Sequence, residues 1–139
     1  MKSSLVPGAR RVERITIDRP RTIGFLGEEM RVYSTPSMVG DVEYTSLKLI
    51  LEHLDETESS VGIHVAIDHL AATPLGHEVE VEVRVVSVDG RKVSVEAEVR
   101  DALEVVGRAT HIRFVVDLAR HRERLTAKAA RLSESRTEP

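Results

Sequence analysis

The chain has 139 residues, of which 41% are hydrophobic and 31% charged, and a net charge of −3. This length suffices for one domain with its own core and is short for two. A slightly acidic chain lacks the basic face of nucleic-acid-binding domains, and no apolar run approaches the roughly 20 residues that span a bilayer. The absence of cysteine excludes a thiolate nucleophile and a disulfide framework, and fits a cytoplasmic protein.

The first part of the chain is predicted to be a lead-in, a strand and a loop. Residues 1–10 have no regular pattern, and we expect them to be a flexible lead-in to a single domain over 11–132. Apolar and polar residues alternate over 12–17, which predicts a strand. Residues 22–34 hold two glycines and several apolar side chains without a regular period. A loop of that length in a small domain is typically a binding loop or a lid.

The rest of the chain shows one apolar helix and then four strand patterns. Residues 38–54 are apolar over more than half of the helical circumference, which predicts a helix buried on most sides. Alternation with period two then predicts strands over 61–72, 78–88, 92–101 and 103–117. The charged, alanine-rich residues 118–132 predict a surface helix, and residues 133–139 a disordered tail.

This order of elements predicts an α+β domain, in which one long helix lies against an antiparallel sheet of about five strands. One helix cannot cover such a sheet, and the edge strands need protection from non-specific pairing. Pairing of edge strands between two copies would provide that protection. We therefore expect a homodimer.

Two ionisable residues are predicted to face the interior. Glu43 shares a helical face with the apolar Val39 and Ile50, and burying a carboxylate is unfavourable unless it is paired or protonated. His69 ends the inward-facing row of the strand over 61–72. Glu43 could instead reach water if the helix were rotated, and His69 could be a structural residue. A carboxylate beside His69 would orient the imidazole and raise its pKa, which suits general acid–base catalysis.

Thr35 precedes Pro36 and is predicted to cap the helix, because threonine is a good N-cap and proline is favoured in the first turn. Within one straight helix, Thr35 and Glu43 would be about 12 Å apart along the axis. Their side chains can therefore meet only if Thr35 lies off the helix and its loop folds back, or if they come from different subunits. Free N–H groups from about Ser37 to Gly40 are candidate donors to a carbonyl oxygen on which negative charge develops.

The remaining polar residues predict little further chemistry. No histidine has zinc-like spacing to acidic partners, so we expect no metal, and no P-loop or dinucleotide fingerprint predicts a cofactor. His111 alternates with Arg113 in the last strand and is predicted to face outward, with Thr110 toward the core. The basic residues between 120 and 128 are predicted to form a solvated helix face. Contact with a phosphorylated cofactor such as coenzyme A is the alternative.

Three sequence segments resemble one known family. They are Thr35 to Glu43 (TPSMVGDVE), Asp68 to Gly76 (DHLAATPLG) and Val88 to Arg91 (VDGR). In order and spacing they resemble the fluoroacetyl-CoA thioesterase branch of the hot-dog-fold thioesterases, over about residues 12–114. The resemblance implies a long central helix wrapped by a curved antiparallel sheet, a homodimer, and hydrolysis of an acyl-CoA thioester. Coenzyme A is then part of a small-molecule substrate rather than a cofactor.

The resemblance also implies roles for individual residues. A catalytic set of threonine, glutamate and histidine falls on Thr35, Glu43 and His69. The implied substrate contacts are Phe25, Val39, Gly40 and Gly62. The fluoroacetyl-specific enzyme carries phenylalanines over the acyl group in the loop before the helix, and this loop has no matching pair. The resemblance therefore implies a short-chain acyl group without specifying fluoroacetyl.

Two other functions are compatible with the same pattern. A hot-dog hydratase would use an acid and a histidine to add water to the double bond of an enoyl-CoA. A non-catalytic module would bind acyl-CoA without turnover. Release of free thiol from an acyl-CoA separates the thioesterase from both.

Overall fold

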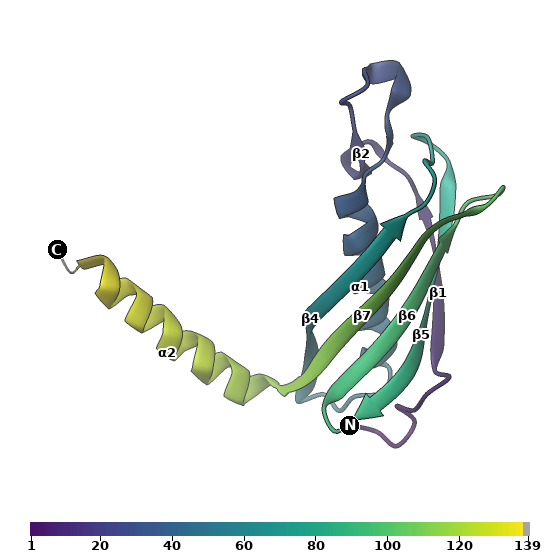
Figure 1. Cartoon of the computed structure of the whole chain (residues 1–139). Coiled ribbons are helices and arrows are strands. Elements are labelled where there is room, and N and C mark those ends of the chain that lie inside the picture. The colour runs from purple at the N-terminus through teal and green to yellow at the C-terminus, as the bar shows by residue number, and fades with distance from the viewer. Residues whose placement is uncertain (138–139) are drawn as a thin grey trace.

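The computed structural model of the chain describes residues 1–137 and shows a long helix laid on one face of an antiparallel sheet (Figure 1). The elements in chain order are β1 (Arg10–Thr16), β2 (Thr22–Ile23), β3 (Val32–Tyr33), α1 (Thr35–Leu51), β4 (Glu58–His69), β5 (Glu78–Asp89), β6 (Lys92–Arg100), β7 (Val105–Asp117) and α2 (Leu118–Thr137). Within the described residues, the main sheet has the order β1-β5-β6-β7-β4, so β1 and β4 are its edges. The predicted α+β architecture is confirmed.

The start of α1 differs from the prediction by one capping residue. Ser34 is the N-cap, and its hydroxyl accepts the N–H of Ser37 at 3.2 Å. Thr35, predicted to be the cap, is instead the first residue of the helix, and Pro36 follows in the first turn. Serine and threonine are both good caps, so the sequence alone did not separate the two positions.

The core lies between α1 and the inner face of the sheet. Met38, Val42, Leu49 and Ile50 of α1 are fully buried. They pack with the alternating valines of the strands, which include Val79, Val81, Val83, Val85, Val93, Val95 and Val99. Full burial of each such side chain stabilises the fold by about 1.5–3 kcal/mol.

One apolar flank of α1 is not covered in the single chain. Tyr44 is 60% exposed and Leu51 43% exposed, while Val39 and Leu47 are half-buried. The predicted burial on most sides of this helix is therefore wrong for one chain alone. The uncovered flank and the free edge of β4 leave two surfaces for a second copy to cover.

Both ends of the chain differ from the predictions. Residues 1–10, predicted to be a flexible lead-in, pack against the body: Leu5 is 5% exposed in the core, and the Met1 amino group pairs with Asp55 at 2.9 Å and with Glu58. Residues 133–137, predicted to be disordered, are the last residues of α2, and 138–139 lie outside the described residues. Figure 1 shows that α2 projects away from the body on the side of β4. None of the helices in residues 1–137 is long and apolar enough to cross a membrane.

Candidate active site

The first turn of α1 places Thr35 beside His69, the last residue of β4. The Oγ1 atom of Thr35 lies 2.8 Å from Nδ1 of His69. Gly107 pairs with His69 across β4 and β7, and a Cβ atom at Gly107 would lie 2.5 Å from the sulfur of Met38 in α1. The absence of a side chain at Gly107 therefore lets the helix approach the sheet closely at this point, which brings the threonine to the histidine.

The second ring nitrogen of His69 is buried and unpaired. Its Nε2 atom has no hydrogen-bond partner within residues 1–137. The ring meets that of Tyr33 edge-on, with centroids 6.2 Å apart. Burial lowers the pKa of His69, partly opposed by a backbone contact with Ala71, so the ring is neutral at pH 7 and can accept a proton. The predicted carboxylate that would raise this pKa is not found beside it.

A second polar group lies under the middle of α1, on the inner face of β7. His111 is 1% exposed and Arg113 6% exposed, so the prediction that His111 faces outward is wrong, and Thr110 is the exposed residue. Nδ1 of His111 lies 2.7 Å from the carbonyl oxygen of His64 and therefore carries the proton. Its Nε2 then accepts from Nη1 of Arg113 at 3.2 Å. Arg113 also donates to the hydroxyl and the carbonyl of Ser60, both at 2.8 Å.

Glu43 belongs to this second group rather than to that of His69. Burial lowers the pKa of both His111 and Arg113, and the negative charge of Glu43 opposes the shift in each. Glu43 is half-buried on the flank of the helix, between the buried and the water-facing positions that the sequence left open. A Cβ atom at Gly62 would lie 3.1 Å from the His111 ring and 3.3 Å from the Arg113 guanidinium. Glycine at this position thus leaves room above the buried cation.

The two groups do not meet within one chain. Thr35 and Glu43 are eight residues apart on α1, about 12 Å along its axis. Gly62 and His69 are seven residues apart on β4, about 23 Å along the strand. Since Thr35 is part of the helix, a folded-back loop cannot bring it to Glu43. Of the two routes that the sequence left open, only contact between subunits remains.

The helix start offers fewer free N–H groups than predicted. The N–H of Ser37 is capped by Ser34, and that of Met38 bonds to the Ser34 carbonyl at 3.0 Å. Val39 and Gly40 lie inside the helix, where each N–H bonds to the carbonyl four residues back. The predicted set of donors from Ser37 to Gly40 is therefore wrong. The N–H of Thr35, the first helical residue, is the remaining candidate in this turn.

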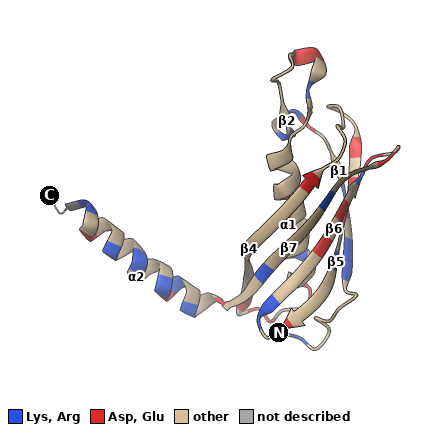
Figure 2. Cartoon of the chain, in the orientation of Figure 1, with Lys and Arg blue, Asp and Glu red and all other residues tan. Residues whose placement is uncertain are grey.

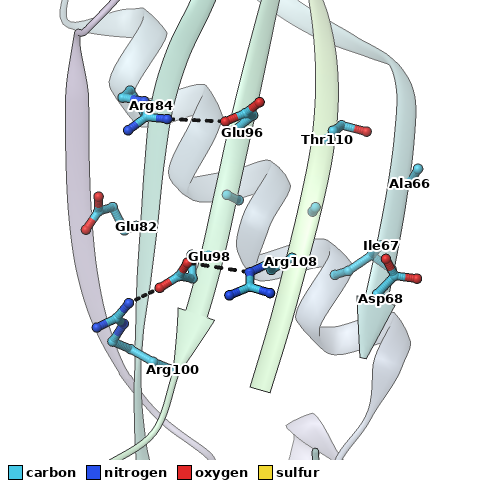
Figure 3. A pocket seen from close by; sticks show the side chains of 12 residues that line it. Ala66, Ile67, Asp68, Glu82, Arg84, Glu96, Glu98, Arg100, Arg108 and Thr110 are labelled. Atoms are coloured by element: carbon cyan, nitrogen blue, oxygen red, sulfur yellow. Dashed lines mark hydrogen bonds and ion pairs between the residues drawn. The ribbon is translucent and has the colours of Figure 1, made fainter. Parts of the chain in front are cut away.

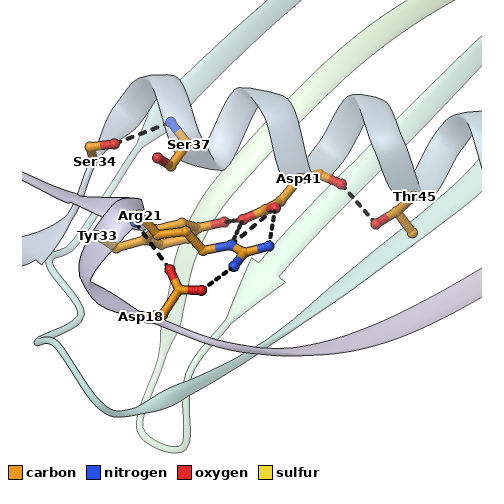
Figure 4. Close-up of polar contacts among 7 residues, drawn as sticks. All are labelled: Asp18, Arg21, Tyr33, Ser34, Ser37, Asp41 and Thr45. Carbon is orange, nitrogen blue, oxygen red and sulfur yellow. Dashed lines mark hydrogen bonds and ion pairs between the residues drawn. The ribbon is translucent and has the colours of Figure 1, made fainter.

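A partly buried ion pair fixes the loop before α1 to the helix (Figure 4). The Asp41 carboxylate accepts from Nε of Arg21 at 3.0 Å and from the Tyr33 hydroxyl at 2.5 Å. Burial and the bond to Asp41 both raise the pKa of Tyr33, so it stays protonated. Asp18 accepts from Nη1 of the same arginine at 2.8 Å. Beyond this anchor the loop extends to Phe25, which is 87% exposed, and its contact with substrate stays a prediction.

The opposite face of the sheet carries paired charges instead of a site. A hollow of about 520 Å³ lies on the face away from α1 (Figure 3). Arg84 of β5 pairs with Glu96 of β6 at 3.2 Å, and Glu98 pairs with Arg108 of β7 and with Arg100 of its own strand. Such exposed pairs stabilise a sheet by about 0.2–1 kcal/mol each. In the part of the chain that the structure describes, no three histidine, aspartate or glutamate side chains are grouped as metal ligands.

Comparison with known proteins places this chain in a family. A sequence model described as fluoroacetyl-CoA-specific thioesterase matches residues 17–119. The chain belongs to this thioesterase family. The fluoroacetyl-CoA thioesterase of Streptantibioticus cattleyicolor is 30% identical to it over 135 residues, which cover 92% of this chain and 94% of that relative.

Solved structures agree on the fold and on the thioesterase superfamily. A thioesterase-superfamily protein of Thermus thermophilus superposes with a TM-score of 0.87 at 25% identity, covering 95% of this chain and 98% of that one. A hot-dog-like protein of Thermanaerovibrio acidaminovorans superposes with a TM-score of 0.81 at 21% identity, covering 88% and 91%. The predicted family, the hot-dog fold and the thioesterase class are thus confirmed.

Proposed function

We propose that this thioesterase hydrolyses a short-chain acyl-CoA to the free acid and coenzyme A, at a site that two chains build together. Thr35 and His69 come from one chain, and Glu43 of the partner subunit completes the set. The observation that carries this proposal is the Nε2 atom of His69, which is buried and unpaired beside the Thr35 hydroxyl. A buried polar atom without a partner is rare in native structures, and a substrate or a partner side chain would satisfy it.

The free edge of β4 supports the shared site. β4 is an edge strand whose last residue is His69. Antiparallel pairing of two copies of β4 across a two-fold axis sets the end of each strand beside the first half of the other. That first half contains Gly62, above Arg113 and near Glu43. The exposed flank of α1 at Tyr44 and Leu51 is covered by the same assembly.

The chemistry follows from the charges of the two groups. The thioester carbonyl lies at the start of α1, where the N–H and hydroxyl of Thr35 stabilise the oxyanion. The partner's Glu43 takes a proton from water, and the water oxygen bonds to the carbonyl carbon. The intermediate then collapses with cleavage of the C–S bond. Neutral His69 relays the proton to the departing thiolate of coenzyme A. Direct attack by the glutamate carboxylate, followed by hydrolysis of the anhydride, gives the same products.

Relatives support the substrate class. Structures of the fluoroacetyl-CoA thioesterase FlK include a variant in complex with fluoroacetate and coenzyme A, and a variant with threonine replaced by serine in complex with acetyl-CoA. Both acyl groups have two carbons. The loop that carries Phe25 has no second phenylalanine, so we propose a short acyl group rather than fluoroacetyl in particular. The proposed setting is a cytoplasmic homodimer.

A thiol-release assay tests this function. Free thiol is measured for acyl-CoA substrates of increasing chain length, with wild-type protein, Glu43→Ala and His69→Ala. We expect short chains to react fastest and each variant to lose about 10²–10⁴ in rate. The matched controls are Glu56→Ala and His121→Ala, which change the same residue types away from both groups. Near-full activity of Glu43→Ala and His69→Ala would refute the assignment, and water addition to an enoyl-CoA without thiol release would indicate a hydratase.

A further inference from the structure

Charge is divided unevenly between the body and α2. Residues 1–117 hold 14 Lys and Arg against 20 Asp and Glu, a net charge of −6, whereas Leu118–Thr137 holds six against two, a net charge of +4. Figure 2 shows the basic residues spaced along the whole projecting helix. The match to the family's sequence model ends at residue 119, near the start of α2. An acidic body repels an anionic substrate, whereas the net positive charge of α2 attracts one.

The base of α2 forms one side of a cleft that arginines line. The cleft has a volume of about 490 Å³, and three arginines reach it from two directions: Arg120 and Arg124 from α2, and Arg91 from the turn between β5 and β6. Arg120 and Arg124 are four residues apart and share a helical face. Neither guanidinium has an ion-pair partner within residues 1–137. Arg91 is held in place by the Val115 carbonyl at 3.4 Å and by Glu58 at 3.5 Å.

Besides the arginines, the cleft is lined by an aromatic ring and by two carboxylates. Phe114 is 40% exposed in this cleft and offers an aromatic face. Two carboxylates also line it, and that of Asp117 accepts the N–H of Arg120 at 3.0 Å, which caps α2. Glu123 is the other. Arginine forks bind phosphate groups with paired hydrogen bonds, and aromatic faces stack on a nucleobase.

We infer that this cleft binds the phosphorylated adenosine end of the coenzyme A thioester, with Arg91, Arg120 and Arg124 on the phosphates and the adenine on Phe114. This inference rests on the proposed function and adds a second recognition site to it. The cleft belongs to the chain whose Glu43 and Arg113 face the acyl group.

Distances along β7 are compatible with one ligand that spans both sites. Arg113 and Asp117 are four residues apart, about 13 Å along the strand. The pantetheine arm between the thioester and the diphosphate has about a dozen covalent bonds, and an extended chain of that size reaches about 15 Å.

Two thioesters of the same acyl group test the inference. Steady-state hydrolysis of the best acyl-CoA is compared with that of the matching S-acyl-pantetheine, which lacks the nucleotide. For the double variant Arg120→Gln/Arg124→Gln we expect KM for the acyl-CoA to rise at least about tenfold while its kcat is unchanged. We expect KM for the acyl-pantetheine to be unchanged as well. The matched control is Arg131→Gln/Arg136→Gln, which removes the same charge from the far end of α2 and leaves KM within twofold of wild type.

The outcomes separate this inference from the proposed function. An unchanged KM for acyl-CoA in the Arg120/Arg124 variant refutes the role of the cleft in binding. The proposed function still holds in that case if the wild-type protein hydrolyses the acyl-CoA. An equal rise in the control variant also overturns it, because the effect would then be long-range attraction. If wild-type protein hydrolyses neither thioester, the function fails. Calorimetric titration with coenzyme A then tests the cleft by itself. The inference requires that coenzyme A binds the wild-type protein and that its Kd rises at least about tenfold in the Arg120/Arg124 variant.

Discussion

Complementation between two inactive variants tests whether the active site spans two chains. In Thr35→Ala and Glu43→Ala homodimers, every site lacks one catalytic group, and we expect each to lose about 10²–10⁴ in rate. Thr35 and Glu43 lie about 12 Å apart on one helix, so one chain cannot bring both to one carbonyl carbon. A heterodimer of the two variants contains one site with both substitutions and one site with neither.

The expected activity of the mixture follows from this count. When equal amounts of the two variants are unfolded and refolded together, about half of the dimers are heterodimers, and each has one intact site of two. The mixture should therefore recover about a quarter of the wild-type rate, at least 25-fold above either variant alone. Thiol release measured before and after mixing gives the result. A mixture no more active than the separate variants would refute a shared site, provided that native mass spectrometry shows heterodimers.

Three further predictions follow from single contacts. Burial lowers the pKa of His69 below the ordinary histidine value of 6.5. The pH at which kcat/KM falls on the acid side should therefore lie below 6.5. A fall that begins above pH 6.5 contradicts the desolvation argument. Gly107→Ala places a Cβ against the sulfur of Met38 and should destabilise the fold by about 1–3 kcal/mol. The control is Gly40→Ala, where the new Cβ meets open space, and it should raise the free energy of unfolding by up to about 1 kcal/mol. Equal changes for the two variants in a urea titration would refute the packing explanation. Tyr33→Phe removes the hydroxyl that donates to the buried carboxylate of Asp41, so it should lower the free energy of unfolding by about 1–3 kcal/mol. A melting temperature equal to that of wild type would show that the hydrogen bond contributes nothing.

Periodicity predicted the sheet well because its strands are half-buried. Alternation located the four long strands to within three residues at every end, and it placed His69 on the inner face. It failed for His111 because the residue that alternates with it, Arg113, is charged and suggested a face toward water. The buried Val106, Ala109 and Val115 occupy the inner face on either side of His111, and they were the better signal.

The candidate site was less predictable because its parts depend on long-range contacts. The buried Arg113 and its bond to Ser60 escaped the sequence analysis, since a charged residue in an alternating strand normally faces water. The sequence left a buried and a water-facing position open for Glu43, and the residue lies at the border of the buried face. No periodic pattern reports which side chains a second copy of the chain supplies. The family motifs predicted a catalytic role for Thr35, for which local signals predicted only a cap.

The uncovered flank of α1 has a consequence for how this enzyme would behave in dilution. A catalytic centre made from two chains exists only while the chains are associated, so turnover depends on the square of protein concentration once dimers dissociate. Leu51→Glu, distant from both polar groups, would then resemble an active-site variant in a dilute assay and regain its rate at high concentration. In such a protein, the rate of hydrolysis and the fraction of dimer fall together as the protein is diluted.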